Sequence, residues 1–304
     1  MNASAGPHPV IPGFTLRRVA AGEVEIAAAV RGEGPPLLLL HGFPQSHLIW
    51  RKVAPALAQR FTVVATDLRG YGASSKPPGD PGHVNYSKRR MAADQLAVMT
   101  ALGFERFAVC GHDRGARVAH RMALDAPLAV DRLAVLDVAP TLAMYEGTTM
   151  AFARAYYHWF FLIQPAPFPE ALIAAAPEAF LRHHMGGRHA GLAPFLPDAW
   201  PHYVRDFSDP AAIHASCEDY RASADIDLRH DEADQAAGKR VRCPLLALWG
   251  RHGVIERQFD ALGAWRAVAT DVRGGSLDCG HYLPEEAPDA LLETLVPFLH
   301  ERRP

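Results

Sequence analysis

The fold is decided by the stretch Phe107-Ala108-Val109-Cys110-Gly111-His112-Asp113-Arg114-Gly115-Ala116-Arg117. It reads as an apolar strand, a turn of the form Gly-x-Asp-x-Gly and the first turns of a helix. Such a turn holds its central residue in a strained conformation, and glycine on either side lets neighbouring backbone pass close by. We therefore expect Asp113 to project from the carboxyl end of the sheet as a nucleophile, rather than to serve only as the N-cap of the helix.

Two backbone amides are expected to form an oxyanion hole beside this aspartate. The helix N-terminus behind Asp113 favours the ionised carboxylate and leaves the N–H of Arg114 without an intrahelical partner. A second loop, His41-Gly42-Phe43-Pro44, directly follows the apolar run Leu37 to Leu40. Its position predicts that the Phe43 N–H is the other donor.

Around this unit, short apolar runs alternate with amphipathic stretches, as in an α/β protein with a mostly parallel sheet and helices on both faces. The expected strands are Leu37 to Leu40, Phe61 to Thr66, Phe107 to Cys110, Leu133 to Leu136, Leu245 to Trp249 and Ala267 to Val272. The expected helices are His47 to Gln59, Ser87 to Leu102, Ala116 to Asp125 and Asp289 to His300. An earlier segment, Phe14 to Val30, alternates around Gly22 and predicts an antiparallel hairpin.

The alternation stops between Pro140 and about Ala224, where the sequence becomes rich in Pro, His and aromatic residues. Helical spacing persists over Thr149 to Leu162, but no buried-strand run follows until Pro244. We expect residues 140–224 to form a helical cap inserted into one α/β core, which would consist of residues 1–139 and 225–304.

Position in the chain selects the general base among sixteen histidines. His281 follows the last expected strand and precedes the last helix, which fits the chain order nucleophile, acid, histidine. The acid is less plain, because the loop after Leu245 to Trp249 has no carboxylate before Glu256. Asp137, at the end of the preceding strand, is favoured over Glu256, since ligands bind at strand carboxyl ends in open α/β sheets.

Composition limits the classes of function. The chain has 304 residues, a formal net charge of −2, 49% hydrophobic and 21% charged residues, as in a globular protein. This balance provides no long-range field for nucleic acid or an anionic membrane, and neither is expected as a partner. Four scattered cysteines predict reduced thiols, and the sequence begins without a signal-like segment. The expected location is cytoplasmic.

On these motifs the sequence resembles, over essentially its whole length, the α/β-hydrolase group of haloalkane dehalogenases, epoxide hydrolases and fluoroacetate dehalogenases. The resemblance is strongest to the fluoroacetate dehalogenases, whose Asp-Arg-x-x-Arg signature is matched by Asp113, Arg114 and Arg117. Haloalkane dehalogenases and many epoxide hydrolases carry Trp directly after the nucleophile, so Arg114 is the informative difference.

The resemblance implies a role for several further residues. The cap His-Trp pair of that family corresponds to His158 and Trp159, and its cap tyrosine corresponds to Tyr220; these three would bind the halide. The acid after the sixth strand corresponds to Asp137. Without the family match, His158 and Trp159 would be read as packing of a cap helix. No cofactor and no metal are implied.

The two arginines independently favour an anionic substrate. A guanidinium in a dry pocket is costly unless it meets an anion, and a planar carboxylate accepts two hydrogen bonds from it. Bringing the carboxylate of a haloacid to ~4 Å from the Asp113 carboxylate would cost about 4 kcal/mol at an effective dielectric constant of ~20. The positive charges of Arg114 and Arg117 can offset this repulsion. An exposed salt-bridge pair on the helix is the alternative.

The expected activity is hydrolytic dehalogenation of a small 2-haloacid, with water as the second substrate and an ester of Asp113 as the intermediate. The first alternative is an epoxide hydrolase, for which Tyr156, Tyr157 and Tyr220 could protonate the opening oxygen. A non-catalytic small-molecule receptor on the same fold is the second. The resemblance also suggests a homodimer.

Overall fold

The computed structural model describes residues 5–301 and contains one nine-stranded sheet in the order β1-β2-β3-β5-β4-β6-β7-β8-β9. The pairs from β1 to β5 are antiparallel, and those from β5 through β4 to β9 are parallel. The strands are β1 Gly6–Pro7, β2 Thr15–Ala21, β3 Val24–Arg31, β4 Pro36–Leu40, β5 Thr62–Thr66, β6 Phe107–His112, β7 Val130–Leu136, β8 Leu245–Gly250 and β9 Val272–Leu277. The expected α/β fold with a mostly parallel sheet is confirmed.

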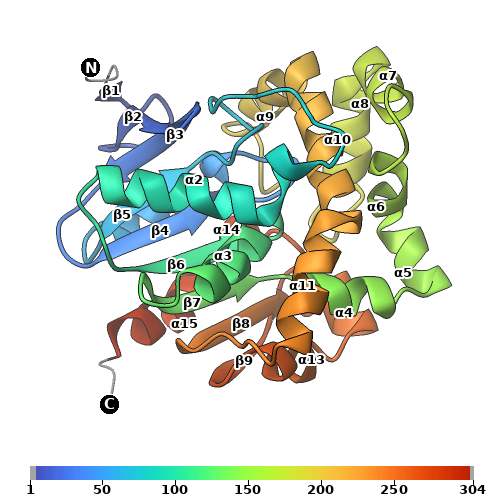
Figure 1. Cartoon of the computed structure of the whole chain (residues 1–304). Coiled ribbons are helices and arrows are strands. Elements are labelled where there is room, and N and C mark those ends of the chain that lie inside the picture. The colour runs from blue at the N-terminus through green and yellow to red at the C-terminus, as the bar shows by residue number, and fades with distance from the viewer. Residues whose placement is uncertain (1–4, 302–304) are drawn as a thin grey trace.

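Helices cover both faces of this sheet, with α2 and α3 in front of it and α15 behind it in Figure 1. The helices of the core are η1 His47–Lys52, α1 Ala54–Leu57, η2 Val84–Tyr86, α2 Lys88–Ala101, α3 Arg114–Asp125, α11 Ile226–Ala236, α12 Val254–Gln258, α13 Ala261–Val268, α14 Leu283–Glu286 and α15 Pro288–His300. None of the helices within residues 5–301 is both long and apolar enough to cross a membrane.

Between β7 and β8 the described chain forms helices and no strand of the sheet. Before α11 these helices are α4 Thr141–Glu146, α5 Met150–Ala155, α6 Tyr157–Leu162, α7 Phe168–Ala175, α8 Pro177–Gly186, α9 Trp200–Phe207 and α10 Pro210–Ala224. Figure 1 shows α5 to α9 gathered beyond the carboxyl ends of the parallel strands. The expected helix over Thr149 to Leu162 is divided in two at Tyr156.

Most expected elements are confirmed, including the hairpin of β2 and β3, which turns at Gly22 with φ 65°. The helix expected over His47 to Gln59 is a 3₁₀ turn followed by one α-helical turn. The strand expected over Ala267 to Val272 is wrong. Its first residues end helix α13, which buries Trp265, and β9 begins only at Val272. The strand Val-Arg-Gly-Gly-Ser-Leu has two glycines and little strand propensity, so its extended conformation is stabilised mainly by its parallel pairing with β8.

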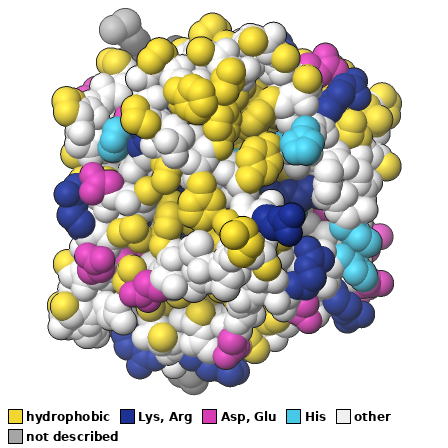
Figure 2. Space-filling model, turned by 90° about the vertical axis from the view of Figure 1, so that its right-hand side faces the viewer, with side chains coloured by type: hydrophobic (Ala, Val, Ile, Leu, Met, Phe, Trp, Pro, Cys, Tyr) yellow, Lys and Arg dark blue, Asp and Glu magenta, His cyan; other side chains and the backbone are white. Residues whose placement is uncertain are grey.

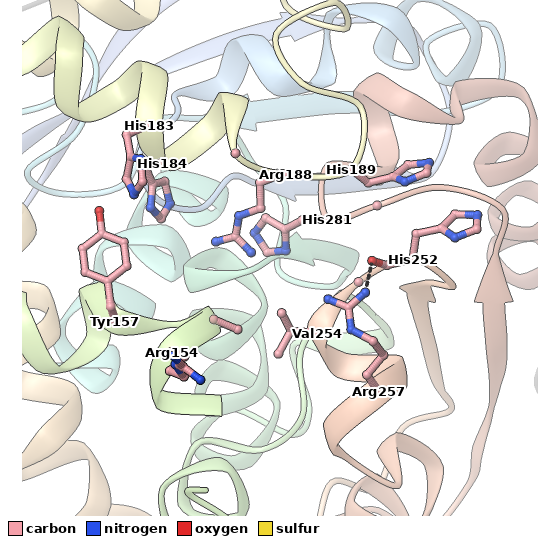
Figure 3. Close-up of a pocket in the computed structure, with 14 residues that line it drawn as sticks. Arg154, Tyr157, His183, His184, Arg188, His189, His252, Val254, Arg257 and His281 are labelled. Atoms are coloured by element: carbon pink, nitrogen blue, oxygen red, sulfur yellow. Dashed lines mark hydrogen bonds between the residues drawn. The ribbon is translucent and has the colours of Figure 1, made fainter. Parts of the chain in front are cut away.

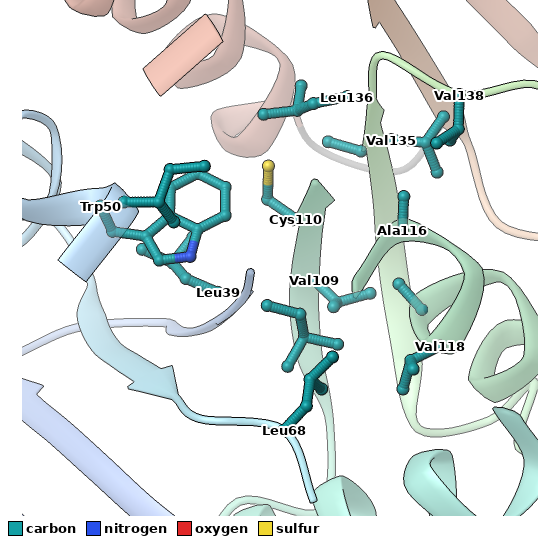
Figure 4. Packing of buried hydrophobic residues seen from close by; sticks show 14 of the residues in the cluster. Leu39, Trp50, Leu68, Val109, Cys110, Ala116, Val118, Val135, Leu136 and Val138 are labelled. Carbon is teal, nitrogen blue, oxygen red and sulfur yellow. The ribbon is translucent and has the colours of Figure 1, made fainter. Parts of the chain in front are cut away.

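The centre of the sheet is close-packed around β6. Val109 and Cys110 are fully buried, and Figure 4 shows them among Leu39, Trp50 and Val118 from neighbouring elements. This packing fixes the strand whose end carries Asp113.

The turn after β6 leaves no room for side chains at its glycines. A Cβ on Gly115 would lie 2.3 Å from the His41 carbonyl oxygen, and one on Gly111 would lie 2.5 Å from the carbonyl carbon of Gly115. Backbone of three segments therefore meets at van der Waals distance beneath Asp113, which is the close approach that the glycine spacing predicts.

Gly115→Ala should lower the free energy of unfolding by about 3 kcal/mol, because the new methyl group overlaps backbone that cannot move aside. Urea unfolding measures the loss. Gly275→Ala is the matched control, since a Cβ there meets no atom within 4 Å. Equal unfolding midpoints for the two variants would contradict the close-packing argument.

Candidate active site

Asp113 lies between β6 and α3 in a conformation that side chains rarely adopt, with φ 48° and ψ −114°. The carboxylate is buried, and its Oδ1 accepts a hydrogen bond of 3.0 Å from the Phe43 N–H. The expected oxyanion donor therefore lies against the aspartate itself. Arg114 is the first residue of α3, so its N–H is one of the amides that a helix leaves unpaired.

Neighbouring imidazoles and guanidiniums keep the Asp113 carboxylate ionised. Burial alone would raise its pKa, but His281, His112, Arg114 and Arg117 together lower the pKa to about 2. An ionised carboxylate can attack carbon without first losing a proton, so the site holds a ready nucleophile.

His281 and Asp137 form the second part of the site. The Nδ1 atom of His281 lies 2.5 Å from Asp137 Oδ2, and the Gly250 N–H donates to Asp137 Oδ1 at 2.9 Å. Asp137 itself has a positive φ of 54°. Glu256, the alternative acid, instead accepts a hydrogen bond from the Trp249 indole on the exposed side of β8. The structure thus places Asp137 against the imidazole and Glu256 away from it.

His112 turns away from Asp113 and holds the loop of His281. Its Nε2 lies 2.8 Å from the His281 carbonyl oxygen, and the two imidazole centroids are 4.7 Å apart. Burial and the neighbouring His281 lower the pKa of His112 to about 4, which keeps its ring neutral and able to donate to that carbonyl.

Arg114 is fully buried and turns one edge of its guanidinium to a carboxylate of the cap. Nε and Nη2 donate to the Asp219 carboxylate at 3.1 and 2.6 Å, and Nη2 also donates to Ser223 Oγ at 2.5 Å. Its Nη1 is buried without a hydrogen-bond partner among the described residues. The guanidinium carbon lies 4.1 Å from the centre of the Tyr220 ring. One edge is therefore fixed, and the other remains available for an anion.

Asp219 is the hub of this buried charge network. It also accepts hydrogen bonds from the Lys88 ammonium and from the Tyr71 hydroxyl, the latter at 2.6 Å. Burial would raise the pKa of Asp219, but Arg114 and Lys88 hold it well below its usual range. Lys88 also lies 3.4 Å from the buried carboxylate of Asp227, so two carboxylates face the two cations of this network.

Arg117 lies one helical turn further and has no carboxylate partner within residues 5–301. Nη1 donates to Thr141 Oγ1 at 2.8 Å and to the Ala139 carbonyl at 3.2 Å, and its Nε is buried without a partner. Its guanidinium carbon lies 4.9 Å from the centre of the Trp159 ring. Burial, and then the charge of Arg114, lower the pKa of Arg117 from its ordinary value. An anion bound beside Arg117 would stabilise its charged form and so counteract this lowering of its pKa.

The cap brings His158, Trp159 and Tyr220 together over the arginines. The His158 and Trp159 ring centroids lie 5.7 and 6.4 Å from that of Tyr220. His158 Nδ1, Trp159 Nε1 and the Tyr220 hydroxyl are all buried without a partner in the described part of the chain. Burial holds the pKa of His158 well below and that of Tyr220 well above the ordinary values, so both rings are neutral. Three unpartnered polar atoms on neutral rings therefore lie within one buried cluster.

Two residues beside this group were not expected from the sequence. Asp219 is 105 positions from Arg114, and no motif connects them, although a carboxylate next to the cap tyrosine is the one available signal. His184 of α8 has its ring 4.5 Å from that of His158 and 5.1 Å from that of Phe43. Helical spacing alone gave it no role.

Comparisons with known proteins agree with this geometry. The family model for the alpha/beta hydrolase fold matches residues 35–288. A fluoroacetate dehalogenase from a Burkholderia species is 48% identical over 96% of this chain and 95% of its own length. A soluble epoxide hydrolase from Corynebacterium sp. strain C12 is 36% identical over 88% and 91%. The crystal structure of ALR0039 from Nostoc sp. PCC 7120 superposes with a TM-score of 0.93 at 55% identity, covering 95% and 99% of the two chains.

Asp219→Asn should lower the free energy of unfolding by about 3–5 kcal/mol, because Arg114 would remain buried without a carboxylate partner and Lys88 would keep only Asp227. Chemical denaturation measures the change. Glu178→Gln, which breaks the exposed pair with Arg182, is the control and should cost at most about 0.5 kcal/mol. A loss at Asp219 as small as that of the control would refute its role as the hub.

Proposed function

The chain belongs to the alpha/beta hydrolase fold family, and we propose that within it the protein hydrolyses small 2-haloacids, fluoroacetate among them, to the 2-hydroxyacid and halide. The observation that carries this proposal is the pair of buried arginines beside an ionised aspartate, each with an unpartnered N–H. The similarity to the Burkholderia fluoroacetate dehalogenase supports it.

The two arginines favour a substrate that carries a carboxylate. A neutral halide or epoxide would leave Arg114 Nη1 and Arg117 Nε without an acceptor, whereas the carboxylate of a haloacid can accept from both. Each charge-assisted hydrogen bond contributes about 1.5–3 kcal/mol, and the substrate charge offsets the cost of burying the guanidiniums. The same contacts orient the carbon next to the carboxylate toward Asp113.

In the first step, Asp113 displaces the halide. Oδ1 is held by the Phe43 N–H, so Oδ2 is the oxygen that attacks Cα from the side opposite the halogen. A carbon–oxygen bond forms, the carbon–halogen bond breaks, and the halide leaves with the bonding electron pair. The product is an ester between Asp113 and the 2-hydroxyacid carbon skeleton.

In the second step, His281 activates water. Its Nδ1 is engaged by Asp137, so Nε2 accepts the proton of a water that attacks the Asp113 carbonyl carbon. The N–H groups of Phe43 and Arg114 stabilise the resulting oxyanion, and each such donor contributes about 3 kcal/mol. Collapse breaks the ester bond and leaves Asp113 as a carboxylic acid, while the proton on His281 neutralises the departing alkoxide. With a pKa of about 2, the Asp113 acid then loses its proton to solvent, which restores the carboxylate.

The halide would leave among the three cap donors. Fluoride loses a tightly bound hydration shell on entering a dry site, so fixed N–H and O–H groups must replace the water. His158, Trp159 and Tyr220 present such groups from two helices, α6 and α10. Because their rings are neutral, they add donors without another full charge.

An epoxide hydrolase is the second candidate. The unpartnered Tyr220 hydroxyl could protonate an opening epoxide oxygen, and the Corynebacterium relative is named a soluble epoxide hydrolase. The two activities share the Asp113 ester and His281, so the arginines distinguish them. The deciding assay measures halide from fluoro-, chloro- and bromoacetate against diol from a styrene-type epoxide. Diol formation without halide release would favour the second candidate.

His281→Asn should release about one halide per active site and then stop, because alkylation does not need the base but hydrolysis does. Mass spectrometry should show a persistent ester on Asp113, and Asp113→Asn should give neither halide nor ester. A His281 variant that never alkylates, or an Asp113 variant that turns over without deamidation, would contradict the mechanism.

The rate of the alkylation step should change less than about twofold between about pH 8 and about pH 3.5, because a pKa near 2 keeps Asp113 ionised throughout. The depressed pKa means that the charged form is lost only as the pH falls through about 2. Rapid-quench measurement of the first halide released tests this in the unmutated enzyme. A decline centred near pH 4 would show an ordinary, unperturbed carboxyl group.

A further inference from the structure

A surface cavity extends inward as far as His281 and is otherwise lined by residues to which no catalytic role has been assigned. This cavity has a volume of about 590 Å³, and its walls come from α5, α8 and the loops after α8, β8 and β9. Arg154, His189 and Arg257 on its rim are exposed, whereas His281 at its inner end is buried. The cavity therefore leads from the surface to the general base.

The described residues that line this cavity include three arginines and five histidines but no carboxylate; the arginines are Arg154, Arg188 and Arg257. Neither Arg154 nor Arg188 forms an ion pair within residues 5–301, and Arg257 donates to the His252 carbonyl. The His252 ring lies 2.8 Å from the exposed carboxylate of Asp278. Figure 2 shows basic and histidine side chains grouped on one part of the cap face. The protein as a whole has a net charge of −2, so this concentration of positive charge is local.

Arg188 is the innermost of the three. In Figure 3 its guanidinium lies beside the His281 ring, with His184 close by. Its guanidinium carbon also lies 5.0 Å from the centre of the Tyr156 ring, which supports the side chain from the cap. Burial, and then the charge of Arg188, hold the pKa of His184 well below its usual range, so the arginine and not the histidine carries the charge here.

The cavity and the catalytic site share a wall. His184 lines the cavity, and its other neighbours are His158 and Phe43 of the catalytic site. His281 likewise lines the cavity while its Nδ1 contacts Asp137. His184 and His281 are therefore lining residues through which the cavity contacts the catalytic site.

We propose that this cavity is the substrate entrance and that Arg188 is an outer binding site for the carboxylate of the haloacid, from which it passes to Arg114 and Arg117. The inference rests on the proposed function. A cleft lined by one sign of charge concentrates small ions of the other sign and raises their association rate by about 10- to 1000-fold. Arg188 thereby selects small monocarboxylates before the reacting residues meet them.

The association rate of bromoacetate tests this proposal directly. Asp113→Asn cannot form the ester, so binding is observed without chemistry, and the fluorescence of Trp159 beside Arg117 reports arrival in stopped flow. Adding Arg188→Gln should lower the association rate constant about tenfold at low ionic strength, and the difference should shrink at about 0.5 M salt, where charges are screened within ~4 Å.

Two further variants separate charge from packing. Arg60→Gln removes an equal charge from an exposed site after α1 and should leave the rate unchanged. Arg188→Lys keeps the charge and should recover most of the rate. If Arg188→Gln stays within twofold of Arg60→Gln, or if Arg188→Lys is as slow as Arg188→Gln, the entrance site is refuted. Absence of halide release from the unmutated enzyme would instead overturn the proposed function, and the entrance site with it.

Discussion

Asp113 must be charged, buried and strained at the same time, and the surrounding structure serves those three conditions. Its positive φ is held by the junction of β6 and α3, where a Cβ on Gly115 would overlap the His41 carbonyl. A residue in such a conformation costs about 1–3 kcal/mol, which close packing of the central strands must offset. This conformation places the carboxylate beyond the end of β6, where the Phe43 N–H donates a hydrogen bond to one of its oxygens.

Burial of one carboxylate explains the arrangement of charge around it. Lys88, Arg114 and Arg117 bring three positive charges into the interior, while Asp113, Asp219 and Asp227 bring three negative charges. Asp219 and Asp227 pair with Arg114 and Lys88, so Arg117 is left near Asp113 without a carboxylate contact among the described residues. Under the proposed function, a substrate carboxylate would give the free N–H groups of Arg114 and Arg117 the acceptor that they lack.

Under the proposed function, the cap contributes several of the residues that bind the substrate. It contributes Asp219 and Tyr220 from α10, His158 and Trp159 from α6, and Arg188 from the loop after α8. The core contributes the nucleophile, the base and the acid at the ends of β6, β9 and β7. Under the proposed function, the reacting groups and the two arginines of α3 thus belong to the core, and the leaving-group donors and Arg188 belong to the segment inserted between β7 and β8.

The sequence by itself determined the alternation of strands and helices, the turn at Asp113 and the position of His281, because these depend on local periodicity and on glycine spacing. It failed at β9, where two glycines conceal a strand that exists only through pairing with β8. Only the tertiary structure decided that Asp137 rather than Glu256 meets His281, that Asp219 fixes Arg114, and that Arg188 stands at the cavity beside the base. The Asp137–His281 and Asp219–Arg114 contacts join residues far apart in the chain. The first is selected by the order of the strands in the sheet and the second by packing of α10 on the core, and neither leaves a periodic trace in the sequence.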